Sequence, residues 1–333
     1  MNRINTIDIV KAWQLIESSI KKDKGKFFRS IFTESKNKIR VAIKGEENLK
    51  SVEFVFNKES FKNLDLNFKD TKGIAVTKES EAGYDNKFIL CIYLKNSVFL
   101  DIYLKLIEKI ITSIYLIKQE KASIQTIYKK LSNWRKCFED ESFDGLTNEE
   151  IRGLYAELTY LKKVLNENLS TEKVILSWKG PERGLHDFIH TNCTAEVKSC
   201  SKNKEKIGIN NIEQLNYKFY KNLFLVVCIL ENSIGGENLN DLINTINNKI
   251  DHNQNAKQAF DDKLNAYGYY EMHKEKYNQS MKVDALVIFK LDNNFPTILK
   301  SDLKKGVSDV TFSINISDCQ KFETNFEEIK KLL

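Results

Sequence analysis

The sequence predicts a mixed α/β protein (α+β) of two domains, residues 1–146 and 147–333. Short runs with strand character, separated by polar connectors, fill much of 27–96, and two runs with helical spacing follow. From Thr147 on, helical and strand patterns alternate. A chain of 333 residues is also longer than the usual single domain. The acidic segment 138–150 between the two patterns is therefore the expected domain junction.

The N-terminal domain is expected to hold an amphipathic helix, an antiparallel β-meander and two long helices. The expected strands are 39–44, 51–57, 64–68, 73–77 and 87–94, with polar connectors such as GEEN between them. Apolar residues at helical spacing then mark the buried faces of the long helices: Leu100, Leu104, Ile107, Ile111 and Ile114 in one, and Ile127, Leu131 and Trp134 in the other.

The C-terminal domain is expected to have a central mixed sheet flanked by helices. Thr147 and Glu150 have the spacing of a capping box, which predicts where its first helix begins. The expected elements are, in order, helix 148–167, strands 174–179, 186–191 and 194–201, helix 209–221, strand 222–230, helices 237–250 and 255–268, and strands 283–291 and 310–316.

The composition narrows the class of protein. A net charge of +6 allows contact with a polyanion but does not require it. The six cysteines form no CxxC pair, so free thiols in a reducing compartment are expected and a zinc site is not. The opening residues lack a secretory pattern, and charged residues interrupt the most apolar region, 88–118, so we expect a cytoplasmic protein without a membrane span. The absence of HExxH disfavours a metalloprotease.

One stretch, HDFIHTNCTAEVKSCS (residues 186–201), reads as two short strands joined by a tight turn. It carries Asp187, Glu196 and Lys198 at positions where a buried sheet favours apolar residues. Alternation along the second strand places Glu196 and Lys198 on the same face. These three charged groups are therefore the first candidates for a functional site.

Two registers of this hairpin fit the sequence. A turn on residues 191–192 sets Asp187 opposite Glu196, an arrangement that destabilises the sheet unless a cation lies between the two carboxylates. A turn on residues 192–193 shifts the pairing and sets Asp187 opposite Lys198. Either register gathers the same three groups.

The helix that begins after Thr147 supplies a fourth group, Glu157. Its buried stripe consists of Leu154, Leu158, Leu161 and Leu165. Glu157 lies beside this stripe with no lysine three or four residues away, so it needs a partner elsewhere, such as a metal ion or the sheet lysine. Gly153 allows the helix to approach the sheet closely.

These groups suit the hydrolysis of a phosphodiester. Asp187, Glu196 and Glu157 can hold a hard cation such as Mg²⁺, with Mn²⁺ as a substitute, while water remains in its shell. The ion lowers the pKa of that water and stabilises charge that builds on a phosphate. Lys198 can orient the nucleophile and offset the negative charge of the transition state.

Each of these residues also has a plainer interpretation. Glu196 and Lys198 fit an exposed edge strand with an ion pair, and the pattern [DE]xK recurs at several other places in the chain. Glu157 fits an acid that reaches solvent, and Gln214 fits an ordinary helix residue. A group of lysines after the second strand fits either a solvated face or contacts to a phosphate backbone: Lys202, Lys204 and Lys206.

By the order of its motifs the chain resembles the PD-(D/E)XK nuclease superfamily, and more narrowly the bacterial "PD-(D/E)XK motif" proteins encoded near restriction and phage-defence genes. The matching residues are Gly153-Leu154, Ala156-Glu157-Leu158, Trp178-Lys179-Gly180-Pro181, His186-Asp187-Phe188, Glu196-Val197-Lys198 and Gln214-Leu215. The resemblance is firm over 148–216, looser through Ile316, and limited to general layout in the N-terminal part. One departure is His186, which stands where the signature has proline.

The resemblance implies a restriction-endonuclease-like core. It makes Asp187 and Glu196 metal ligands and Lys198 the catalytic lysine. It makes Glu157 an auxiliary acid. Related nucleases often place a glutamine at the position of Gln214, where it contacts DNA or water.

Two functions follow as hypotheses. The first is a Mg²⁺-dependent DNA endonuclease of restriction-modification or anti-phage defence. Cutting both strands needs two sites, so a homodimer or an assembly with protein partners is expected, and the N-terminal domain then recognises DNA or a partner. The alternative is a nuclease-fold subunit of a defence complex that binds DNA or proteins without cutting. The opposed carboxylates argue against this alternative, because a binding module has no use for them.

Overall fold

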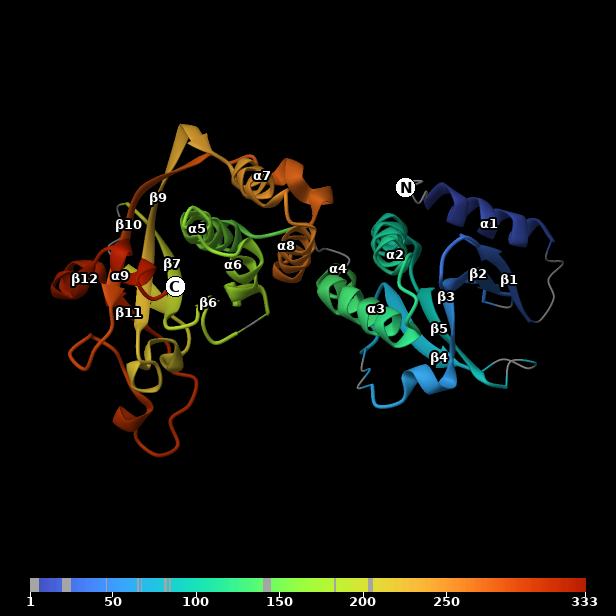
Figure 1. The fold of residues 1–333 in the computed structure, drawn as a ribbon, viewed down its shortest axis with the longest axis horizontal. Coiled ribbons are helices and arrows are strands. Elements are labelled where there is room, and N and C mark those ends of the chain that lie inside the picture. The colour runs from blue at the N-terminus through green and yellow to red at the C-terminus, as the bar shows by residue number, and fades with distance from the viewer. Residues whose placement is uncertain are drawn as a thin grey trace. The chain divides into compact units, whose positions relative to one another are not determined.

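The computed structural model describes residues 6–19, 25–45, 47–64, 66, 68–80, 83, 85–139, 145–182, 184–202 and 206–333, and of Lys136 and Met272 only the backbone. The chain forms two compact units, Met1–Phe143 and Asp144–Leu333 (Figure 1). Each contains a five-stranded sheet and helices. The predicted mixed α/β fold class is confirmed.

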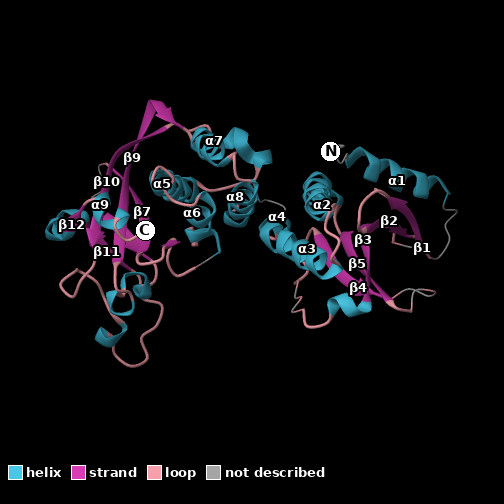
Figure 2. Cartoon of the chain, in the orientation of Figure 1, coloured by secondary structure: helices cyan, strands magenta, loops and turns pink. Residues whose placement is uncertain are grey.

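The N-terminal unit contains an antiparallel sheet with strand order β1-β2-β3-β5-β4 (Figure 2). Its elements are α1 (Thr6–Ser19), β1 (Lys26–Ile31), β2 (Lys38–Lys44), β3 (Leu49–Asn57), β4 (Ile74–Glu79), β5 (Lys87–Leu94), α2 (Leu100–Ile114), α3 (Glu120–Trp134) and α4 (Lys136–Glu139). The expected meander is wrong in one respect, because β5 rather than β4 pairs with β3. The described residues of the expected strand 64–68, namely 64, 66 and 68, lie outside any strand.

A row of polar residues crosses this sheet. In the strand register Arg40 pairs with Glu53, Glu53 with Cys91, and Cys91 with Thr77. Because successive side chains on a strand alternate between faces, all four point to the same face. Their neighbours on the opposite face, such as Val52, are apolar and buried, which provides a surface for helices to pack on.

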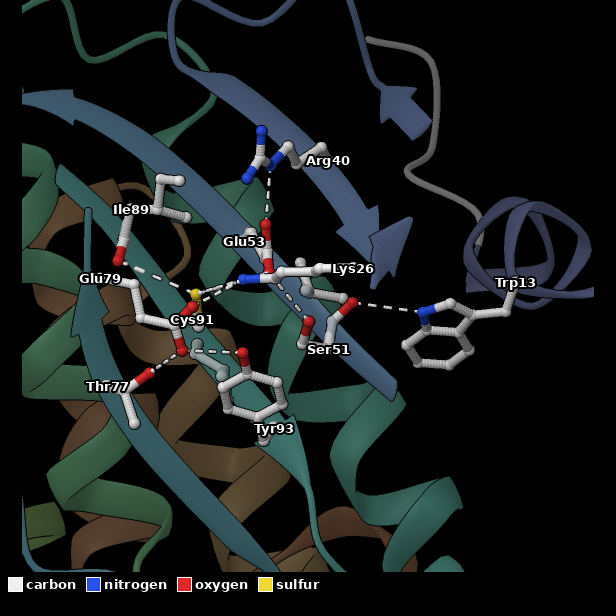
Figure 3. Close-up of polar contacts among 12 residues, drawn as sticks. Trp13, Lys26, Arg40, Ser51, Glu53, Thr77, Glu79, Ile89, Cys91 and Tyr93 are labelled. Atoms are coloured by element: carbon white, nitrogen blue, oxygen red, sulfur yellow. Dashed lines mark hydrogen bonds and ion pairs between the residues drawn. The ribbon is translucent and has the colours of Figure 1, made fainter. Parts of the chain in front are cut away.

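The sheet is curled around its polar face (Figure 3). Lys26 and Glu79 lie on the two edge strands, which in a flat five-stranded sheet are about 19 Å apart. Yet Lys26 Nζ lies 2.8 Å from Glu79 Oε2 and 2.5 Å from Glu53 Oε1. Arg40 Nε forms a second ion pair with Glu53, 2.7 Å from its Oε2. Two cations and two carboxylates therefore join the edges of the sheet through one network.

The C-terminal unit contains a mixed sheet with strand order β12-β10-β9-β7-β6. Its elements are α5 (Asn148–Val164), α6 (Thr171–Ser177), β6 (Phe188–Ile189), β7 (Thr194–Ser201), β8 (Lys206–Ile209), β9 (Leu223–Glu237), α7 (Leu239–Ile250), α8 (Gln254–Tyr267), β10 (Met281–Lys290), β11 (Phe312–Asn315), β12 (Glu323–Thr324) and α9 (Phe326–Lys330). Strands β7 and β9 are parallel, and the other neighbouring pairs are antiparallel. β8 and β11 form a separate two-stranded sheet.

The central strand β9 divides the core of this unit into two layers. Phe224 and Val226 belong to the cluster that contains the apolar residues of α5, α7 and α8. Leu225 and Val227 belong to a second cluster, on the side of β8 and β11. This alternation explains the long apolar run of the strand, because both of its faces are covered.

The start of α5 is as predicted. Thr147 Oγ1 accepts a hydrogen bond from Glu150 N at 3.2 Å, and Glu150 Oε2 accepts one from Thr147 N at 2.9 Å. The capping box is therefore confirmed.

Two sequence predictions in this unit are wrong. The β-branched run at 174–179 predicted a strand, but most of it lies in helix α6, where Val174 and Ile175 are buried against the helical layer while Leu176 is exposed. Tertiary packing has overridden local propensity here. The expected helix 209–221 is replaced by two 3-10 turns, η4 (Ile212–Leu215) and η5 (Tyr217–Phe219).

Asparagine side chains explain the second error. Asn211 Oδ1 accepts a hydrogen bond from Glu213 N at 2.9 Å, and Asn216 Oδ1 accepts one from Lys218 N at 3.3 Å. Such local bonds give the backbone an alternative to the α-helix. The segment therefore runs as two short turns beside β7.

All six cysteines are free and buried. Among the described helices, none combines the length and apolar character needed to cross a membrane.

Candidate active site

The β6–β7 hairpin has the register in which the turn falls on residues 191–192. His190 N donates to Cys193 O at 2.9 Å, and Phe188 pairs with Ala195. The first of the two predicted registers is therefore confirmed. Continued by one residue, it sets Asp187 beside Glu196.

Asp187 replaces a strand partner at the edge of β7. The β6 ladder ends at the pair Phe188 and Ala195. Beyond it, Val197 N donates to the carboxylate oxygen Oδ2 of Asp187 at 2.8 Å. This bond holds the carboxylate at the sheet edge, next to the segment that carries Glu196 and Lys198.

Glu196 and Lys198 form a buried ion pair on β7. Lys198 Nζ lies 2.7 Å from Glu196 Oε1, and the two side chains are 19% and 1% exposed. Burial and the Asp187 carboxylate raise the pKa of Glu196 to about 8. Burial alone would lower the pKa of Lys198, but the carboxylates of Glu196 and Asp187 outweigh it and raise that pKa, so the ammonium group keeps its charge.

Glu157 reaches this cluster from α5. Its Oε2 accepts a hydrogen bond from Trp178 Nε1 at 2.7 Å. Burial, and next the Asp187 carboxylate, raise its pKa well above the ordinary value. The indole of Trp178 is thus one partner of this acid.

Gly180 lets the two acids meet. A Cβ atom at this position would lie 2.3 Å from Glu157 Oε2 and 3.1 Å from Asp187 Oδ1. The backbone also binds here, because Lys179 N and Gly180 N both donate to Asp187 O, at 2.6 and 3.1 Å. The conformation of this turn and the absence of a side chain at Gly180 together create the space that the carboxylates occupy.

Helix α8 holds the turn in place. The ammonium group of Lys263 donates to Trp178 O and lies 2.5 Å from Glu182 Oε1. One helical turn further on, Tyr267 lies close enough to the acids that burial, Glu157 and Asp187 raise its pKa. No sequence signal marked Lys263 or Tyr267, since both act through contacts between distant segments.

The carboxylates of Glu157, Asp187 and Glu196 line one cavity of about 740 Å³, together with Lys198. Its acids are Glu149, Glu150, Glu157, Asp187 and Glu196, and its bases are Arg152, Lys198 and Lys206. Gly153, Gln214 and Tyr267 also line it. The structure therefore brings together all five residues predicted as the catalytic set.

Gln214 lies on η4, and His186 fixes that turn. His186 Nε2 is 2.9 Å from Gln214 O, so this nitrogen carries the proton and donates. The imidazole packs edge-on against Tyr220, with 4.6 Å between ring centroids. Gln214 Oε1 is buried without a hydrogen-bond partner. The histidine in the place of the signature proline thus supports the segment that carries Gln214.

The three predicted phosphate-contact lysines differ in their surroundings. Lys202 Nζ lies 3.0 Å from Asp284 and 3.6 Å from Glu231, so surface acids already offset its charge. Lys206 lines the cavity. Lys204 lies outside the described residues.

The donor set fits Mg²⁺ with few protein ligands. Among the residues described, no three His, Cys, Asp or Glu side chains are arranged to hold a metal ion together. However, neither carboxylate oxygen of the buried Glu196 makes a geometrically good hydrogen bond. Asp187 Oδ1 and Glu157 Oε2 both border the space next to Gly180. Mg²⁺ commonly takes only one or two protein carboxylates and keeps several waters, so Asp187 and Glu196 suffice as ligands.

A family model described as "Putative PD-(D/E)XK family member, (DUF4420)" matches residues 9–317. The chain belongs to this family. The match covers both units, including the N-terminal one, whose own sequence resembled the PD-(D/E)XK proteins only in general layout. Neither the curated proteins nor the solved structures contain a match. For this PD-(D/E)XK family member the resemblance seen in the motifs is confirmed, and the α/β core with its mixed sheet is consistent with a restriction-endonuclease-like fold.

Proposed function

We propose that this protein is a Mg²⁺-dependent DNA endonuclease of restriction-modification or anti-phage defence. The observation that supports the proposal is the meeting of Asp187, Glu196 and Lys198 in one cavity, in a chain of the PD-(D/E)XK family. Desolvating two acids beside a partly buried, charged lysine costs folding free energy. Such an arrangement is typical of a functional site, here one that binds a cation and a phosphate.

Each group has a distinct task in this proposal. Asp187 and Glu196 would hold Mg²⁺, with Mn²⁺ as a substitute, and the bound ion would supply an activated water and offset charge on the phosphate. Lys198 orients the nucleophile and stabilises negative charge. Glu157, held by Trp178, is the auxiliary acid beside these two ligands rather than the third ligand that the sequence suggests. Gln214, which lines the same cavity, contacts the DNA or water.

The proposed assembly follows from the need to cut two strands. One cavity can cut one strand at a time, so a homodimer or an assembly with protein partners from a defence operon would supply the second site. The N-terminal unit would recognise DNA or a partner. Lys206 would contact the phosphate backbone.

A plasmid assay tests the proposal by removal of the metal. Supercoiled plasmid is incubated with the full chain in Mg²⁺, in Mn²⁺ and in EDTA, and the nicked form is quantified. Nicking is expected in either metal, none in EDTA, and recovery when excess Mg²⁺ is added. Asp187→Asn protein, purified in the same way, should give no product, which excludes a contaminating nuclease. No product in either metal, with DNA still shifted in a gel, would instead support the non-cleaving subunit.

Gly180→Ala is expected to reduce nicking by about 100-fold or more, because displacing catalytic groups by about 1 Å has a cost of that order. The added methyl group would clash with Glu157 Oε2, which lies 2.3 Å from its position. Gly208→Ala is the matched control, since Gly208 lines the same cavity but a Cβ there would contact nothing within 4 Å. Equal nicking by the wild type and Gly180→Ala would contradict the proposed arrangement of the acids.

A further inference from the structure

One cation of the cavity, Arg152, has no task in the proposed chemistry. Arg152, on the first turns of α5, lies at the end of β7 that is remote from Glu196. Its Nη2 is 3.2 Å from Ser201 Oγ and 3.4 Å from Cys200 O. Asp187 and Glu196 lie toward the other end of the same strand, while Glu149 and Glu150 line the cavity from the same turns of α5 as Arg152. Arg152 is therefore separate from the acidic centre on β7.

The hydrogen-bond partners of Arg152 do not neutralise its charge. Those partners are two backbone carbonyls, one hydroxyl and one side-chain amide, all of them neutral: Cys200 O, Leu230 O, Ser201 Oγ and Asn232 Oδ1. The distances of 3.2 to 3.5 Å are long for hydrogen bonds of a cation. A guanidinium offers five N–H donors in a planar fork, which matches a phosphate well. Arg152 thus retains both charge and donors for an anion.

The spacing suits a DNA strand. Arg152 precedes Glu157 by five residues, or about 7.5 Å along α5. Ser201, which Arg152 contacts, follows Lys198 by three residues, or about 10 Å along β7. One strand of duplex DNA rises about 3.4 Å per nucleotide. Both measures exceed the rise per nucleotide, so a phosphate at Arg152 would be a different one from the phosphate at the acidic centre.

We propose that Arg152 binds a backbone phosphate near, but distinct from, the phosphate at the acidic centre, and so sets where the strand lies in the cavity. This inference rests on the proposed function. Arg152 would be a substrate-binding residue that makes no contact with the scissile bond. Lys202, at the same end, is a poor candidate because Asp284 and Glu231 already offset its charge.

The test is a scan of single phosphates in a binding assay. Short DNA duplexes, each with one neutral methylphosphonate linkage, are bound to the full wild-type chain and to Arg152→Gln in EDTA, so that no cleavage occurs. The wild type is expected to lose about 10- to 100-fold in affinity when the contacted phosphate is neutral. Arg152→Gln should lose a similar factor on unmodified DNA and show no further loss at that linkage. For this variant, the slope of log affinity against log salt should also be smaller in magnitude by about one.

Two further variants make the result specific. Arg152→Lys keeps the charge without the fork, so it should restore part of the affinity and the sensitivity to that linkage. Lys202→Gln should bind like the wild type at every linkage. Circular dichroism and thermal unfolding verify that the variants are folded, and Arg152→Lys carries the test alone if Arg152→Gln fails to fold.

The outcomes separate this inference from the proposed function. Equal penalties at every linkage in the wild type and the Arg152 variants would overturn the phosphate contact and leave Arg152 as a brace between β7 and β9. If the wild type also cuts plasmid, the proposed function would survive that result. The opposite combination is also possible: one neutral linkage weakens binding in the wild type but not in Arg152→Gln, and the protein cuts no plasmid. That result would support the contact and refute the endonuclease.

Discussion

Lys198→Ala is expected to lower the rate of Mg²⁺-dependent plasmid nicking by about 1,000-fold, the usual cost of removing a preorganised group that stabilises charge in the transition state. Lys198 is partly buried beside carboxylates, with its ammonium 2.7 Å from Glu196 Oε1. Its raised pKa keeps it charged when a phosphate enters. Single-turnover nicking at saturating protein measures the loss.

A second measurement on Lys198→Ala separates chemistry from folding. Asp187 and Glu196 remain in the variant, and a competing positive charge is gone, so Mn²⁺ should bind at least as tightly as in the wild type by calorimetry. Lys202→Ala is the matched control, because that lysine follows on the same chain segment but is exposed and paired with surface acids, and it should nick normally. Wild-type nicking by Lys198→Ala would remove this lysine from the mechanism.

Glu53→Gln is expected to destabilise the N-terminal unit by about 3–5 kcal/mol, the typical effect of removing one member of a buried ion network. Glu53 is fully buried and pairs with both Lys26 and Arg40. Without its charge, Arg40 stays buried but loses its ion pair with Glu53, and Lys26 keeps its ion pair with Glu79 but loses the one with Glu53. Hydrogen exchange of β2, β3 and β5 should accelerate, while β7 and β9 stay protected.

An exposed pair in the same sheet provides the control for Glu53. Lys44 and Glu47 lie 3.4 Å apart with side chains 51% and 59% exposed, so Glu47→Gln should change stability by less than about 1 kcal/mol. Joint replacement of Arg40 and Glu53 by methionine should recover part of the loss, since apolar groups can fill the space without unpaired charge. Unchanged exchange in Glu53→Gln would show that the network does not hold the sheet.

Local patterns predicted much of the site, because its central residues lie on one hairpin. Asp187 and Lys198 are eleven positions apart, and strand alternation with a two-residue turn leaves only two ways to bring them together. Choosing between those ways needed the pairing of Phe188 with Ala195, which no pattern records. Gln214 was placed in the right region but on the wrong element. The side chain of Asn211 bonds to the backbone of the next turn and so competes with helix formation, which the apolar pattern does not show.

The sequence by itself determined the α/β class, the family, the capped start of α5 and the charged trio of the β6–β7 hairpin. All of these follow from residue order over short distances, where periodicity and turn chemistry act. Only the tertiary structure decided that Trp178 and Gly180 shape the environment of Glu157, that Arg152 faces the same cavity, and that Lys26 reaches Glu79 across a curled sheet. The physical reason is that these contacts join segments far apart in the chain, and their partners are selected by packing and desolvation rather than by spacing.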